Sequence, residues 1–162
     1  MPKVRAETKA WFKGRLPKDW FVGEPEIAGD RDEVLITGEL KPVDLEPGAS
    51  EQAVLASREG LIKRFREETR AARMEIADEV EQKWRRKLSW GVSAGGETHL
   101  FTHLSIPVMT RLRLQERLTL DTLVDAGVAR TRSDALAWCV RLVAKNQEKW
   151  LGELSKAFEH VE

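Results

Sequence analysis

The spacing of apolar residues alternates between strand-like and helical periods along the chain. Near the N-terminus, Trp20–Val22 and Val34–Thr37 are short runs dominated by aromatic and β-branched residues, a composition typical of β-strands. Between them, Ala28–Asp32 has the composition of a turn. We therefore expect a β-hairpin in which Pro25 confines one strand to a sheet edge, since proline cannot donate a ladder hydrogen bond.

A long helical segment is predicted after residues 41–48, a linker rich in proline and glycine. Ser50 can cap the first turn, and strong helix formers continue to about Leu88. One face is apolar, because hydrophobic residues recur at helical spacing. These residues are Leu61, Phe65, Ala72, Ile76, Val80 and Trp84. Gly60 weakens the first part, so two helices are an open alternative, and Ser93–Gly96 is interpreted as a flexible joint.

Between residues 100 and 114 the apolar character follows a two-residue period, which places alternate side chains on opposite faces of a strand. The apolar residues of one parity are Leu100, Leu104, Ile106, Val108, Leu112 and Leu114. The other parity includes Met109, Arg111 and Arg113. Pro107 interrupts the run, so we expect strand pairing to concentrate after it.

Helical spacing then returns in two segments. The first begins near Gln115 and ends at Gly127, a residue that adopts positive φ at little cost. A second helix is predicted from Thr131–Asp134, where a hydroxyl cap is followed three residues later by a carboxylate. Apolar residues continue at near-heptad spacing from Asn146 to Val161, so we expect this helix to be extended.

The order of strand, helix, turn and capped helix over Met109–Val143 resembles the ribbon-helix-helix (Arc/MetJ/CopG-like) family of DNA-binding proteins. The resemblance covers less than half of the chain, and its clearest part is Ala126–Leu136, which is similar to the family's turn and second-helix start. It implies that strands from two chains pair antiparallel and enter the major groove, which admits a two-stranded ribbon.

The resemblance also implies which residues contact DNA. Met109, Arg111 and Arg113 would face the base edges, where arginine presents a planar donor fork to guanine. The start of the second helix would hold a backbone phosphate, because free N–H groups and the helix dipole attract an anion there. The residues at this second contact are Arg130, Thr131, Arg132 and Ser133.

Other interpretations of these residues stay open. Alternating arginine and leucine is also typical of any exposed amphipathic strand, and protein side chains contact phosphate more often than bases. A capping box by itself indicates only the start of a helix, and the Asp134 carboxylate weakens the positive potential there. Met109 departs from the polar residue usual in the family, so it can touch a thymine methyl or read nothing.

A homodimer follows from the small size of the predicted C-terminal unit. One strand cannot satisfy its own ladder groups, and one strand with two short helices buries too little surface to be stable alone. Pairing with an identical chain about a two-fold axis solves both problems. Leu112, Leu114, Leu118 and Leu123 would then form a shared core, and assembly beyond a dimer stays open.

The composition narrows the function classes further. Lysine and arginine number 27, as do aspartate and glutamate, so the net charge is zero and any affinity for phosphate must come from a local patch. Cys139 is the one cysteine and the apolar runs are too short to span a bilayer, so we expect a cytoplasmic protein without a membrane contact. The sequence contains no zinc spacing, phosphate loop or nucleophile elbow, so we expect no cofactor, no metal and no enzymatic activity.

Together these patterns predict an α+β, mostly helical protein in three parts. These are an N-terminal β-hairpin region (1–48), a long amphipathic helix (49–92) and a ribbon-helix-helix domain with an extended C-terminal helix (93–162). The expected function is that of a dimeric, sequence-specific reader of double-stranded DNA and transcriptional regulator, whose N-terminal module oligomerises or binds a protein partner. The alternative is an interaction module or antitoxin-like adaptor that uses the C-terminal fold mainly to dimerise.

Overall fold

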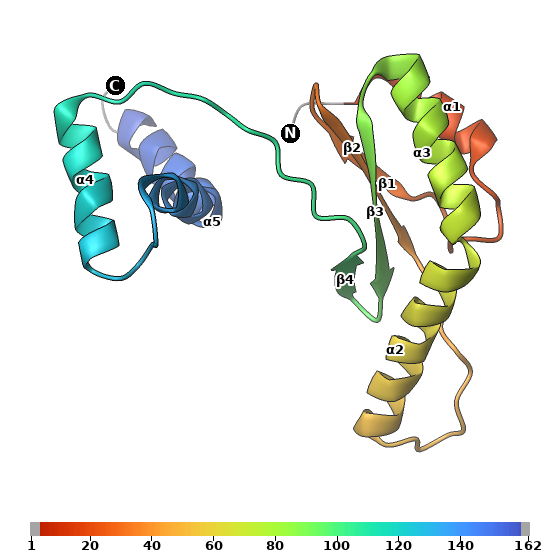
Figure 1. Cartoon of the computed structure of the whole chain (residues 1–162). Helices are drawn as coiled ribbons and strands as arrows, with labels where there is room; N and C mark the ends of the chain where they lie inside the picture. The colour runs from red at the N-terminus through yellow and green to blue at the C-terminus, as the bar shows by residue number, and fades with distance from the viewer. Residues whose placement is uncertain (1–3, 160–162) are drawn as a thin grey trace. The chain divides into compact units, whose positions relative to one another are not determined.

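The computed structural model describes residues 4–159, with side chains described as far as Glu153. The chain forms two compact units, Met1–Pro107 and Val108–Glu162, and each is described by itself (Figure 1). The fold is α+β, and the described residues form five helices and one four-stranded sheet. The first unit contains α1 (Ala6–Arg15), β1 (Glu26–Gly29), β2 (Glu33–Glu39), α2 (Glu51–Glu68), α3 (Arg70–Trp84), β3 (Lys87–Ala94) and β4 (Glu97–Leu100). The second contains α4 (Leu114–Asp125) and α5 (Arg132–Glu159).

The sheet of the first unit has the order β1-β2-β3-β4. The two outer pairs are antiparallel and are joined by short turns, whereas the central pair β2–β3 is parallel, with Ile36 opposite Trp90. Parallel neighbours need a long crossover connection, and α2 and α3 supply it. As a result, β1 and β4 are the two edges of the sheet.

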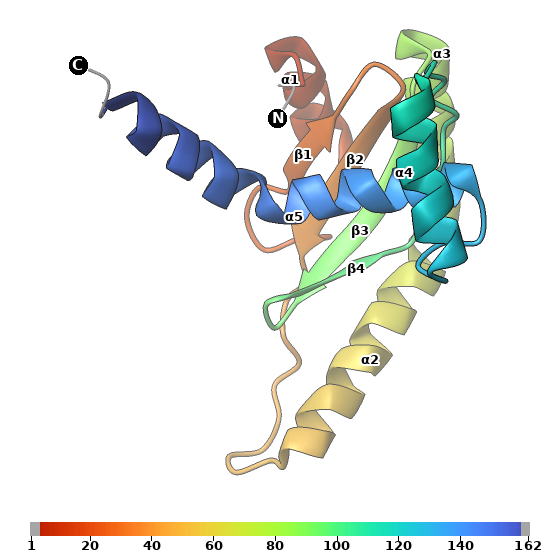
Figure 2. The ribbon, with the colours of Figure 1, turned by 90° about the vertical axis from the view of Figure 1, so that its left-hand side faces the viewer.

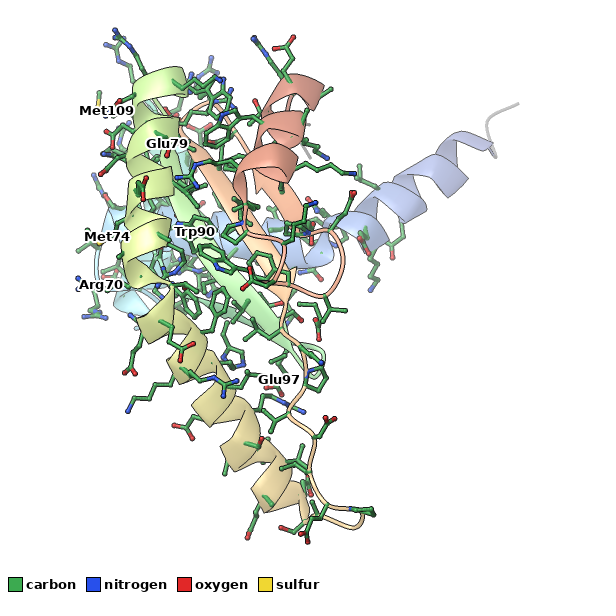
Figure 3. All side chains as sticks on the ribbon, turned by 90° about the vertical axis from the view of Figure 1, so that its right-hand side faces the viewer. Arg70, Met74, Glu79, Trp90, Glu97 and Met109 are labelled. Carbon is green, nitrogen blue, oxygen red and sulfur yellow. The ribbon has the colours of Figure 1, made fainter. Side chains whose placement is uncertain are left out.

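The core lies between the sheet and the helices α1 and α3, which cover the same face (Figures 1 and 2). Val34 and Ile36 of β2 are fully buried. They share a cluster with Phe12 of α1, Ile76 of α3 and Trp90 of β3, and Figure 3 shows Trp90 beside α3. The sequence did not predict α1, because its residues are mostly polar and Phe12 is the side chain that anchors it.

The expected β-hairpin is present, but its first strand is β1 rather than Trp20–Val22. The Trp20 ring packs edge-on against Phe65 and Trp90, at centroid distances of 5.7 and 5.8 Å. Trp20 and Phe21 therefore pack against the core instead of forming a strand. This finding corrects the strand prediction for Trp20–Val22. β1 begins directly after Pro25 and lies at a sheet edge, as expected.

The predicted long helix is two helices and ends earlier than expected. They are separated at Thr69 rather than at Gly60, and α3 ends at Trp84. Arg85 follows in the left-handed conformation, with φ of 55°, which turns the chain away from the helix. Residues 87–94, which were assigned to the helix end and the joint, form the buried strand β3.

Strand β3 forms because alternate side chains such as Leu88 and Trp90 are buried against the helices. The sequence contains this period-two signal, since Leu88, Trp90 and Val92 alternate with small residues, and the prediction of a helix up to Leu88 overlooked it. Gly95 and Gly96 both have positive φ and close the tight β3–β4 turn, which corrects the expectation of a flexible joint. The boundary between the two units consequently lies after Pro107 instead of at that turn.

The helix pair of the second unit follows the predicted signals. α4 begins at Leu114 and ends before Gly127, which has φ of 73°. The Thr131 hydroxyl caps α5 by accepting a hydrogen bond from the Asp134 N–H at 3.1 Å. The buried residues between the helices are Leu120, Ala129 and Ala135. Of the predicted stripe in the last turns of α5, Trp150 and Leu151 are exposed, and the later members Leu154, Phe158 and Val161 lie outside the described side chains.

Among the residues that the structure describes, no helix is both long enough and apolar enough to cross a membrane.

Candidate nucleic-acid interface

The predicted DNA-reading strand is an extended segment without a ladder partner among residues 4–159. After β4, no residue from 102 to 113 belongs to a helix or sheet of the described structure. Leu112 is half-buried against the α4–α5 core, whereas Met109 is 94% exposed. Arg111 and Arg113 are also exposed. The expected alternation is present only from Arg111 to Arg113, where Leu112 packs on its own unit between two arginines open to solvent. Val108 and Leu114, which were expected to face inward with Leu112, are 85% and 58% exposed.

Two polar contacts fix the junction between this segment and α4. The Arg113 backbone N–H donates a hydrogen bond to the Glu116 carboxylate, and Arg117 Nη1 donates to the Leu112 carbonyl at 2.6 Å. The backbone of residues 108–111 makes no hydrogen bond within the described chain, so its groups are free for an external partner. Sequence reasoning missed Glu116, although a carboxylate three residues after a helix cap is a known signal.

The four residues predicted to hold a phosphate lie around the start of α5. Arg130, Thr131 and Ser133 are exposed there. The Asp134 carboxylate accepts a hydrogen bond from the Arg130 backbone N–H at 3.1 Å. This contact holds the Asp134 carboxylate at the start of α5, where the sequence predicted it. The carboxylate there satisfies the Arg130 N–H, which would otherwise lack an acceptor.

Arg132, in contrast, is engaged with α4. Its Nε and Nη2 donate hydrogen bonds to Oδ1 and Oδ2 of Asp121, each at 2.7 Å. These bonds and the guanidinium charge hold the pKa of Asp121 below its ordinary value, and the same contact raises the pKa of Arg132. Sequence reasoning missed Asp121, which lies eleven residues away on another helix, and no local signal marks it.

The second unit also exposes large apolar side chains. They include Val108, Leu114, Leu118, Val140, Leu142 and Val143, with Trp150 and Leu151 further along α5. Leu114 and Leu118 were expected in a core shared by two chains, and both are open to solvent in the single chain. A second apolar surface placed against them would remove this area from water, which is the main driving force of association.

The described side chains include no group of three His, Cys, Asp or Glu residues that could hold a metal ion. Cys139 is half-buried and packs against the small α4–α5 core. Its surroundings are those of a small apolar residue.

Comparisons with known proteins divide the chain in the same way as the structure. The model of the Rv1265-like protein N-terminal domain matches residues 6–100, and that of the Mb1296 C-terminal domain matches residues 113–162. The chain is 55% identical over 152 residues to uncharacterized protein Mb1296 of Mycobacterium bovis and to uncharacterized protein Rv1265 of Mycobacterium tuberculosis. Each alignment covers 94% of this chain and 66% of the relative, so the chain spans slightly less than two thirds of the length of these curated relatives. No solved structure matches the chain. The family model covers residues 6–100, which are most of the first unit and more than half of the chain. The chain therefore belongs to the family of Rv1265-like proteins.

Proposed function

We propose that this protein is a dimeric, sequence-specific DNA-binding protein and transcriptional regulator whose second unit is a ribbon-helix-helix module. One observation carries the proposal. Residues 108–111 are extended, their backbone groups have no partner in the described chain, and Arg111 and Arg113 are exposed while Leu112 packs inward. A reader of DNA also implies a cytoplasmic location, in agreement with the single cysteine.

The proposed ribbon is centred near Thr110. Because the Arg113 N–H is already bonded to Glu116, the ladder with the second chain is limited to the residues before it. Two copies of 108–111 related by a two-fold axis pair antiparallel and satisfy each other's backbone groups. Leu112 then lies on the protein side of the ribbon, and Arg111 lies on the opposite side.

The same pairing covers the exposed apolar surface. Leu114, Leu118 and Val140 are each close to or more than half exposed, at 58%, 46% and 61%. Helices from two chains that pack through these residues form one core in place of two incomplete ones. Each leucine or valine side chain that becomes fully buried contributes roughly 1.5–3 kcal/mol.

The proposed DNA contacts separate into two kinds. Arg111 and Arg113, with Met109 beside them, read base edges in the major groove. Arg130 and Ser133 hold a phosphate at the start of α5, where the helix dipole favours an anion. Arg132 has a different part, because its bidentate bond to Asp121 positions α5 against α4.

Selection of bound duplexes from a random library tests this function, followed by titration of the enriched duplex at several salt concentrations. The double variant Arg111→Ala/Arg113→Ala is expected to lose the preference for the enriched duplex over random duplex by at least about tenfold, since each bidentate base contact contributes roughly 1–3 kcal/mol. The matched control Lys145→Ala/Lys149→Ala removes the same charge from the second half of α5 and keeps the preference. Equal preference in the wild type and the arginine variant rejects base reading.

An adaptor that uses the second unit mainly to dimerise is the second candidate. It is supported by the neutralised Arg132, the apolar Met109 and the zero net charge, which all lower the affinity for a polyanion. On this alternative the library yields no enriched duplex, and the chain still sediments as a dimer. A chain that forms a dimer and also enriches a specific duplex from the library supports the function of a transcriptional regulator.

A further inference from the structure

We infer that the groove between α2 and β4 in the first unit is a docking site for an acidic, extended peptide segment of a partner protein, which adds a strand to the edge of the sheet. This inference stands apart from the proposed DNA-binding function, because every residue of the groove belongs to the first unit. It rests on an open strand edge, an apolar floor and cations without carboxylate partners.

The groove follows one side of α2 and has a volume of about 1010 Å³. Its apolar lining includes Leu55 and Ile62 of α2, and Leu100 and Phe101 at the end of β4. Leu55 is 50% and Leu100 is 40% exposed. Exposed apolar surface in a groove of this size is typical of a binding site for a short segment.

Strand β4 offers its free edge along this groove. The Phe101 N–H donates to the Trp90 carbonyl at 2.7 Å, and His99 is opposite Val92 in the antiparallel register. Because hydrogen-bonded positions alternate in an antiparallel pair, the N–H and C=O groups of Thr98 and Leu100 point away from β3. An extended segment can bond to them as a fifth strand.

The β3–β4 hairpin is in contact with α2 through Arg58. The Arg58 guanidinium of α2 lies directly against Gly95 in the turn, so a side chain at this position would have to displace it. Arg58 also lies 3.9 Å from the Glu97 carboxylate, and Figure 3 shows Glu97 beside α2. A strand edge that is fixed before binding loses little conformational entropy when a segment pairs with it.

The charged side chains that line the groove are slightly more cationic than anionic. They are the cations Arg58, Lys63, Arg66 and Arg70 and the carboxylates Glu59, Glu67 and Glu97. Lys63, Arg66 and Arg70 are all exposed, and none of them has a carboxylate oxygen within 4.0 Å among the described side chains. Glu97 is shared by Arg58 and His99, whereas Glu59 and Glu67 have no cation within 4.0 Å among the described side chains. An acidic segment therefore finds a small excess of positive charge here, and its acidic residues can pair with Lys63, Arg66 and Arg70.

Arg73, behind these residues, adds to the positive potential. It is 8% exposed, and its guanidinium lies 5.0 Å from the Phe101 ring centre, with Arg66 at 5.6 Å from the same ring. Arg73 Nη2 donates to the Arg66 carbonyl at 2.7 Å. Burial, and the nearby charges of Arg66 and Arg70, lower the pKa of Arg73. Carboxylates in the groove would relieve this concentration of positive charge.

A panel of fluorescein-labelled octapeptides that alternate glutamate or aspartate with valine, isoleucine or leucine tests the inference on the full chain. Fluorescence anisotropy is expected to show saturable binding of members of this panel, and none for a matched panel with lysine in place of the acidic residues. Amide hydrogen exchange at Thr98 and Leu100 is expected to slow on binding, because an added strand takes up these N–H groups.

Variants separate the groove from general charge effects. Lys63→Glu/Arg70→Glu is expected to weaken binding at least about tenfold, since each reversed surface charge loses an attraction and adds a repulsion. Arg64→Glu/Lys41→Glu changes the charge equally on exposed residues outside the groove and leaves the affinity within about twofold. Thr98→Pro removes one edge donor and also weakens binding.

Three outcomes overturn the inference: no acidic peptide binds, the lysine panel binds as well, or binding leaves exchange at Thr98 and Leu100 unchanged. If duplex DNA protects these amides in place of the peptides, the groove is a nucleic-acid contact and the inference is wrong. Circular dichroism of each variant confirms that it is folded before its affinity is compared.

Discussion

The Arg132 guanidinium forms a bidentate pair with the Asp121 carboxylate, with both nitrogen–oxygen distances at 2.7 Å. The pair joins the start of α5 to the middle of α4 across a connection that contains the left-handed Gly127. A residue expected to contact DNA thus fixes the angle between two helices. The remaining proposed phosphate contacts, Arg130 and Ser133, depend on this angle for their position.

The Asp121–Arg132 pair should stabilise the folded chain in a pH-dependent way. The folded-state pKa of Asp121 is lowered from its ordinary value of 3.8, so its contribution is present above that pH and is lost as the pH falls through the folded-state pKa. Asp121→Asn is therefore expected to lower the melting temperature most near neutral pH and least in acid. Calorimetry of both proteins between about pH 7 and pH 3 measures this difference.

Asp125→Asn is the matched control for this prediction, because Asp125 is also an exposed carboxylate of α4 and has no ion pair among the described side chains. The change in melting temperature caused by Asp125→Asn should not depend on pH in the way expected for Asp121→Asn. A difference between wild type and Asp121→Asn that stays constant over the whole pH range contradicts the assigned pairing.

Exchange of the two charges tests whether Arg132 positions α5 or contacts DNA. The double variant Asp121→Arg/Arg132→Asp keeps an ion pair at the same place, so its melting temperature is expected to exceed that of Arg132→Asp alone. If Arg132 serves position only, the double variant also keeps most of the DNA affinity of the wild type. A loss of about tenfold or more, in a variant of restored stability, assigns Arg132 to phosphate contact.

Local signals in the sequence predicted the second unit better than the first. The Thr131 cap, the stop at Gly127 and the inward Leu112 each depend on residues within a few positions, and all three are present. The pairing of residues 108–111 with a second chain is not a local property, so it stays a prediction. The bidentate contact to Asp121 is not local either, and for that reason it was missed.

The first unit depends on long-range packing that local patterns do not reveal. Strand β3 follows directly on a run of helix formers, and it becomes a strand because β2 lies beside it, with Leu35 opposite Ser89. Helix α1 has too few apolar residues for a helical stripe, and Phe12 is buried because Trp84 and Ile76 surround it. Helix α1 therefore could not be assigned from local patterns, whereas β3 carries a period-two pattern that the preceding helix formers outweighed.

Phe12 should carry much of the stability of the first unit. Its side chain is 0% exposed and lies in the cluster that contains Ile76 and Trp90. Phe12→Ala leaves a cavity, which typically costs about 3–5 kcal/mol, whereas the exposed neighbour Lys9→Ala is expected to cost less than about 0.5 kcal/mol. Urea unfolding followed by tryptophan fluorescence measures both values, and similar midpoints for the two variants contradict the core assignment.

The proposed dimer makes its sharpest prediction at Thr110 and Leu118. Thr110 lies at the centre of the two-fold ribbon, so Thr110→Pro removes a ladder donor, and Leu118→Glu places a charge in the shared apolar contact. An unpaired buried charge costs several kcal/mol, which corresponds to a rise of about a hundredfold or more in the dimer dissociation constant. Thr119→Glu is the control, because Thr119 follows Leu118 in α4 and is also exposed. It adds the same charge outside the proposed apolar contact between the two chains and should leave the dimer intact. Sedimentation equilibrium measures all three variants. A wild-type chain that sediments as a monomer at high micromolar concentration rules out the ribbon and, with it, the proposed way of reading DNA.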